Sequence, residues 1–223
     1  MTAIEGMEGY SPDGIFLGFD PGGASKFGVA LLDAGRLTAA TVDTVDDAMA
    51  WARGACGDRE PIAAGVDTLL HWATSKSGVR PCDLELRSRY PNSKNSIMAP
   101  NSLFGAMAIG GVALALRLRE QWPHLLLNET HPKVFSHALG FRYDPKSAGS
   151  VRAAIEWFDG KRPCAHRMQG EHQFDAALSA WATELGVTAN WPCIIGDNAN
   201  LLYPAGRVSY LWPTTDHIVS IIG

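Results

Sequence analysis

The stretch that decides the fold is GIFLGFDPGGASKFGVALLD, residues 14–33. It opens with a near-continuous apolar run at residues 15–19, which is typical of a strand buried on both faces. Residues 21–23, Pro-Gly-Gly, predict a turn, and the apolar pattern resumes at residues 27–32. We therefore expect a β-hairpin with a lone carboxylate, Asp20, where the first strand ends. An Asp before Pro-Gly also commonly bonds its own backbone, so a purely turn-stabilising role for Asp20 is an alternative of equal weight.

The composition fits one domain. The chain has 223 residues, 46% hydrophobic and 19% charged, which is enough to bury a full core. We expect a single domain over residues 1–223, with a core at about 14–187 and a C-terminal extension at about 188–223. The net charge is -4 and the pI about 5.9, so no overall positive field attracts nucleic acid or anionic membrane. A polyanion would have to meet a local basic patch.

Cysteine usage and the N-terminus favour a cytoplasmic protein. The four cysteines are scattered and form no C-x-x-C pair, which indicates neither a zinc knuckle nor a disulfide framework. The N-terminal residues include acids and lack the apolar region of a signal peptide. No run of eighteen apolar residues occurs, so we expect no membrane segment.

The rest of the chain alternates strands and helices. Thr44 and Asp47 form the pattern of a capping box that opens a helix to residue 52. Residues 74–100 indicate a polar loop with at most one short helix. The other predicted elements are strands at 36–42, 62–67 and 125–129 and helices at 102–122, 150–158 and 174–185. This order predicts an α/β protein with a ribonuclease H-like mixed sheet, in which antiparallel hairpin strands and parallel strands are flanked by helices. The C-terminal extension is expected to add strands or an ordered flap.

Acidic residues recur where predicted elements end or begin. Asp20, Asp67 and Glu129 each end a strand, and Asp175 lies in the first turn of the last long helix. Two divalent cations about 4 Å apart can hold the attacking and leaving oxygens of a phosphodiester, and carboxylates from separate elements are suited to bind them. We therefore expect these four acids to hold Mg²⁺ or Mn²⁺. His172, three residues before Asp175, is expected to join the metal shell or to move a proton.

Each acid has a structural alternative. Asp67 could cap the turn that follows its strand, and Asp175 could do no more than complement the helix dipole. Glu129 could form a salt bridge with Arg87 or Lys133. The hypothesis of a site therefore depends on the four acids together.

The main basic concentration lies in the polar segment at residues 74–100. Arg80 and Arg87 in this segment, together with Lys26 in the predicted turn of the hairpin, are predicted to contact substrate phosphates, which makes nucleic acid a candidate partner. The alternative is a solvated loop whose arginines pair with Asp83 and Glu85.

Several motifs carry a resemblance to known families. GFDPGG at residues 18–23 and H-x-x-D-A-A-L at 172–178 resemble the first and last acidic motifs of Holliday-junction resolvases of the RuvC type. GVDTLL at 65–70, RPCDLELR at 80–87, NETHP at 128–132 and HQFDAALSAW at 172–181 resemble the family of domain of unknown function 429. That family is a predicted nuclease group of ribonuclease H-like fold. The resemblance covers about residues 16–185 and implies a metal-dependent nuclease.

Two other classes of function remain open. The D-P-G-G-x-S-K pattern that ends in Lys26 also resembles the first phosphate loop of the actin and sugar-kinase superfamily, which would make the chain a nucleotide-binding protein. The short length and the lack of a second D-x-G loop disfavour this alternative. The chain could also be a non-catalytic module that depends on a partner, and an apolar tail favours a homodimer.

Overall fold

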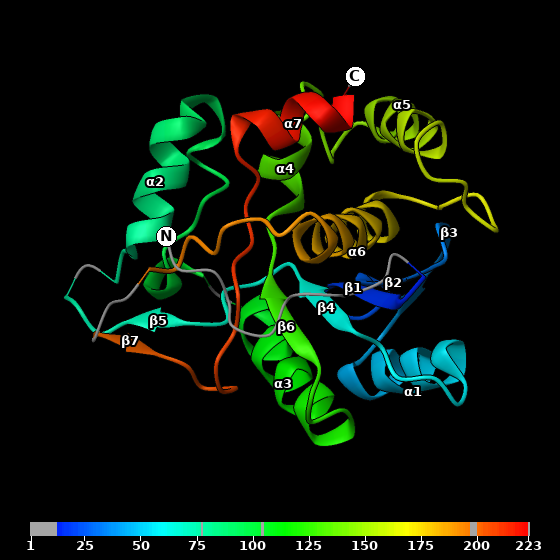
Figure 1. Cartoon of the computed structure of the whole chain (residues 1–223), viewed down its shortest axis with the longest axis horizontal. Helices are drawn as coiled ribbons and strands as arrows, with labels where there is room; N and C mark the ends of the chain where they lie inside the picture. Colours follow the sequence, from blue (N-terminus) through cyan, green and yellow to red (C-terminus); the bar gives the residue numbers. More distant parts are fainter. Residues whose placement is uncertain (1–12, 77, 104, 197–199, 223) are drawn as a thin grey trace.

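The computed structural model describes residues 13–76, 78–103, 105–196 and 200–222. Its main sheet has five strands in the order β3-β2-β1-β4-β6 (Figure 1). The hairpin of β1 (Ile15–Asp20) and β2 (Phe27–Asp33) continues antiparallel into β3 (Arg36–Val42). On the other side, β4 (Ala63–Val66) runs parallel to β1, and β6 (Leu126–Glu129) runs parallel to β4. This combination of strand order and direction is the ribonuclease H-like mixed sheet, and the predicted fold class is confirmed.

Helices cover both faces of the sheet. On one face lies α6 (Glu171–Thr188), with α4 (Pro132–Ala138) and α5 (Ala148–Asp159) farther out (Figure 1). On the other face lie α1 (Val45–Cys56) and α3 (Ala106–Gln121). The predicted cap of α1 forms, because the Thr44 side chain accepts a hydrogen bond from the Asp47 amide. Two layers of apolar side chains, one on each face, make up the core.

Glycines let α6 lie close against the strands. A Cβ atom at Gly18 would lie 2.0 Å from the Ala176 carbonyl oxygen, and one at Gly28 would lie 1.9 Å from the His172 carbonyl oxygen. Both distances are far below van der Waals contact, so these positions accept no side chain without moving α6. The first two turns of α6 are thereby held against β1 and β2.

The polar segment after β4 contains more regular structure than a loop. It includes α2 (Pro81–Arg89) and two short 3₁₀ turns, η1 (Pro91–Ser93) and η2 (Pro100–Ser102). The prediction of at most one short helix holds for α2. The helix α4 was not predicted, because Pro132 suggested only the end of a strand, whereas proline also fits the first position of a helix.

The C-terminal segment packs along the edge of the main sheet. Its strand β7 (Leu201–Leu202) pairs antiparallel with β5 (Trp72–Ala73), and Ser209 forms a parallel bridge with Asn128 of β6. The pairing of β7 fulfils the expectation of added strands, and the bridge at Ser209 covers part of the edge of β6. The chain ends in α7 (Thr215–Ile222). Among the described residues, no helix is long and apolar enough to span a membrane.

Candidate metal centre

Three buried carboxylates meet at one end of the sheet. Asp20 is the last residue of β1, Asp67 directly follows β4, and Asp175 lies near the start of α6. Each offers an oxygen atom, and the three oxygen atoms lie within 4.8 Å of one another. Three of the four predicted acids are thus brought together by three separate elements.

The alternation of side chains along a strand explains this meeting. Gly18 and Gly65 are partners in the β1–β4 ladder, and both lie under α6. Two residues farther along each strand, Asp20 and Asp67 point to the same face. Because α6 is held against this face, Asp175 reaches both of them.

The cluster carries unfavourable like charges when no cation is bound. Burial, followed by the nearby Asp20 and Asp175 carboxylates, raises the pKa of Asp67 well above its ordinary value. Burial and Asp20 raise the pKa of Asp175 to about 7. Oxygen donors of this kind suit a hard divalent cation such as Mg²⁺ or Mn²⁺, which would offset the repulsion. The residues present therefore fit the predicted metal.

His172 is in direct contact with the cluster. Its Nδ1 atom donates to Asp20 Oδ2 at 2.7 Å, and the side chain remains partly exposed. The hydrogen bond to Asp20 raises the pKa of His172, against the smaller effect of partial burial. His172 therefore lies beside the acids, as the sequence predicts.

Two neighbours of Asp175 were not identified as site residues from the sequence. Tyr143 donates a hydrogen bond from its hydroxyl group to Asp175 Oδ1, and Lys133 Nζ lies 3.7 Å from Asp175 Oδ2. Burial opposes the charge of Lys133, but Asp175, Asp67 and Asp20 outweigh it and raise the pKa of the lysine. Lys133 directly follows the NETHP motif, so its position in the sequence could have indicated that it lies near the site. Tyr143 lies in an irregular segment and carried no signal.

Glu129 does not join the three aspartates. Asn128 and Thr130, its neighbours, hydrogen-bond to Thr183 and Ser179 of α6, so Glu129 points away from that face. Instead its carboxylate accepts hydrogen bonds from Arg80, with Nη2 to Oε1 at 2.7 Å and Nη1 to Oε2 at 2.8 Å. Both its oxygens are thus occupied by a fully buried partner, and this corrects the expectation of a metal ligand. Glu129 does form a salt bridge, as the structural alternative predicts, but its partner is Arg80 rather than Arg87 or Lys133.

The three residues that are predicted to contact phosphate lie in different environments. Arg80 is fully buried and also binds Asp83, with Nη2 to Oδ1 at 2.7 Å, so it braces α2 and cannot reach a substrate. Arg87 is partly exposed and donates from Nη2 to the Ile97 carbonyl oxygen at 2.6 Å. Lys26 is exposed in the turn between β1 and β2. For Arg87 and Lys26, contact with substrate stays a prediction.

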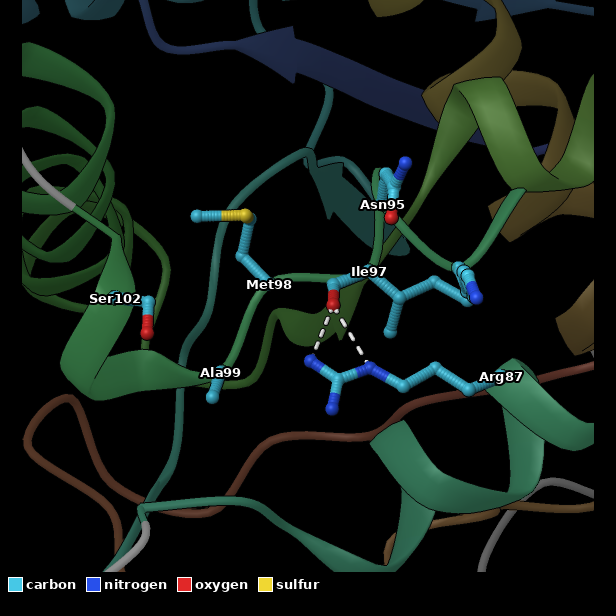
Figure 2. Close-up of a pocket in the computed structure, with 7 residues that line it drawn as sticks. Arg87, Asn95, Ile97, Met98, Ala99 and Ser102 are labelled. Atoms are coloured by element: carbon cyan, nitrogen blue, oxygen red, sulfur yellow. Dashed lines mark hydrogen bonds between the residues drawn. The ribbon is translucent and has the colours of Figure 1, made fainter. Parts of the chain in front are cut away.

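Two neighbouring cavities lie near this end of the sheet, and the smaller one reaches the carboxylates. The smaller, of about 190 Å³, is lined by Asp67 and Lys133 among others. The larger, of about 430 Å³, is lined by Arg87 and Lys94. Figure 2 shows the larger cavity, where Arg87 reaches from α2 to the carbonyl group of Ile97. A ligand that enters the smaller cavity would lie next to the acidic cluster.

Comparisons with known proteins do not identify the family of the chain. No protein-family model matches the sequence, and no curated protein does, so the resemblance to the domain of unknown function 429 family stays a prediction. Among solved structures, the chain is similar to T. thermophilus RuvC in complex with Holliday junction substrate. The sequence identity is 13% and the TM-score 0.41, over 79% of this chain and 96% of the RuvC chain. The fold assignment therefore depends on strand order and direction rather than on this similarity.

Proposed function

We propose that this chain is a divalent-metal-dependent phosphodiester hydrolase that acts on nucleic acid. The observation that supports this function best is the meeting of Asp20, Asp67 and Asp175, whose oxygens lie within 4.8 Å of one another in a buried position. A cluster of unneutralised carboxylates is costly to bury, so it is expected where a cation completes it.

The three aspartates would hold Mg²⁺ or Mn²⁺. When bound, such an ion activates a water molecule and stabilises charge on a phosphoryl group. The smaller cavity leads a substrate past Asp67, and Lys133 in its wall provides a positive charge for an anionic phosphate. His172, oriented by Asp20, would accept or return a proton at Nε2, which lies 3.6 Å from Glu171 Oε1.

Cleavage assays on matched variants test this proposal. Wild type, Asp20→Asn and the exposed control Asp58→Asn are incubated with Mn²⁺ and fluorescent single-stranded and duplex DNA and RNA. We expect cleavage by wild type and Asp58→Asn and a loss of at least about 100-fold in Asp20→Asn, whose melting temperature should not fall. Cleavage retained in Asp20→Asn would remove the carboxylates from the mechanism.

The same samples separate the other functions. A nucleotide-binding protein would show a rise in melting temperature with ATP and no cleavage. A non-catalytic module would show neither response.

A further inference from the structure

The two cavities are neighbours that share part of their walls. Asn95 and Met98 line both of them. In Figure 2 these two residues lie on the opposite side of the Ile97 backbone from Arg87. We call the two neighbouring cavities together the groove, which extends from Asp67 beside the acidic cluster to Arg87 of α2.

The charge of the groove changes sign along its length. Near the cluster it contains Asp67 together with Lys133. Farther away, the charged residues in its wall are Arg87 and Lys94, both cations. Neither of them forms an ion pair with a carboxylate among the described residues, unlike Arg80 and Arg89. In a chain of net charge -4, these uncompensated cations are suited to a bound phosphate.

Between the two charged ends the wall is mixed. Met98, Leu103 and Met107 provide apolar contact in the smaller cavity, and Asn95 and Ser96 provide polar groups. A volume of about 190 Å³ is well below that of pockets for drug-sized ligands and suits one flat ring system. A base that is paired within a duplex cannot enter such a cavity, whereas an unpaired base can.

Given the proposed function, we infer that the substrate is an unpaired nucleic-acid strand that lies in this groove. Its scissile phosphate is at the aspartates, the adjacent base is in the smaller cavity against Met98, and the next phosphate meets Arg87 and Lys94. This inference rests on the proposed function for the position of the scissile phosphate. The selectivity for an unpaired strand comes from the groove itself.

Binding of short fluorescent oligonucleotides tests the inference without cleavage. Anisotropy is measured in EDTA and in Ca²⁺ with a single strand, its duplex and a series of strands in which one abasic site moves along the sequence. Lys94→Glu reverses an exposed cation of the groove, and Arg152→Glu makes the same change of charge on α5, which lines neither cavity.

We expect the single strand to bind more tightly than the duplex, and one abasic position to weaken binding. Lys94→Glu should lower single-strand affinity by about 3- to 10-fold and reduce the salt dependence by roughly one phosphate contact, while Arg152→Glu matches wild type. The inference would be overturned if the duplex bound as tightly as the single strand or more tightly, or if no abasic position weakened binding. It would also be overturned if Lys94→Glu and Arg152→Glu bound the single strand alike. If a separate titration shows that wild type does not bind Mn²⁺ while the strand selectivity is preserved, the proposed function is overturned and the groove is not.

Discussion

Asp175 has the most crowded surroundings of the three aspartates. It is buried, it accepts a hydrogen bond from Tyr143, and it faces both Lys133 and the Asp20 carboxylate. The hydrogen bond from Tyr143 and the positive charge of Lys133 partly offset the repulsion, yet burial and Asp20 together still raise the pKa of Asp175 to about 7. When no cation is bound, ionised Asp175 therefore lowers the stability of the folded state. This is the expected cost of a preformed cation site.

This cost predicts a pH-dependent gain in stability for Asp175→Asn in the metal-free protein. The folded pKa of Asp175 is raised above its unfolded value of 3.8, so the native state binds more protons and wild type loses stability as pH rises from about 4 to about 7. Asparagine cannot ionise and avoids this loss. We expect the variant to be more stable by a few kcal/mol at about pH 8 and by little at about pH 4.

Thermal unfolding in EDTA over this pH range measures the effect. Asp58→Asn, an exposed acid, serves as the control and should follow wild type. Equal stability of Asp175→Asn and wild type at all pH values would contradict the repulsion within the cluster. Added Mn²⁺ should stabilise wild type and not the variant.

Glu129 and Arg80 predict the opposite behaviour. Burial alone would raise the pKa of Glu129, but Arg80 and His71 lower it to about 2. Ionised Glu129 therefore stabilises the fold fully above pH 4.5, the pKa of the residue in the unfolded state. This stabilisation is lost as the pH falls toward 2. We expect Glu129→Gln to destabilise the protein by about 2–4 kcal/mol at neutral pH, because Arg80 keeps only part of its charge compensation.

Denaturant unfolding at pH 7, together with Mn²⁺ titration at low temperature, separates a structural role from ligation. Glu129→Gln should unfold earlier and still bind Mn²⁺ with nearly the affinity of wild type. A variant of normal stability that no longer binds Mn²⁺ would restore Glu129 as a ligand.

At the scale of elements, the site depends on how closely α6 approaches the strands. Gly28→Ala places a Cβ atom 1.9 Å from the His172 carbonyl oxygen, so the start of α6 must move away from β2. We expect a loss of about 2 kcal/mol or more in unfolding free energy and weaker Mn²⁺ binding, because Asp175 moves with the helix. Gly23→Ala is the matched control in the same hairpin, since its nearest neighbour would lie 4.0 Å away. If the two variants unfold and bind alike, close packing of α6 is not what positions Asp175.

The elements that follow local sequence patterns could be predicted, and the contacts between distant segments could not. The strands of the hairpin, the helix cap at Thr44 and the late helix with Asp175 follow local patterns, and they were predicted from the sequence. The direction of Glu129 could have been deduced, because Asn128 and Thr130 are the polar residues that alternate with it. The contact of Tyr143 with Asp175 could not, since it joins an irregular segment to α6 by packing alone.

At the scale of the whole molecule, the chain is acidic, and three cations line the two cavities near the cluster: Lys133, Arg87 and Lys94. This distribution suits a protein that holds nucleic acid locally and does not bind it by overall charge. The predicted homodimer stays a prediction. The exposed side chains of Val219 and Ile222 on α7 are one apolar surface that it could use.

The proposed metal joins three elements that are distant in sequence, so its binding tests the account most directly. The measurement is isothermal titration of Mn²⁺ into metal-stripped wild type and Asp67→Asn. We predict saturable binding to wild type and a loss of at least about tenfold in affinity in the variant, which keeps its fold. Equal binding by the two proteins, or no binding to wild type, would contradict the claim that Asp20, Asp67 and Asp175 form a metal centre.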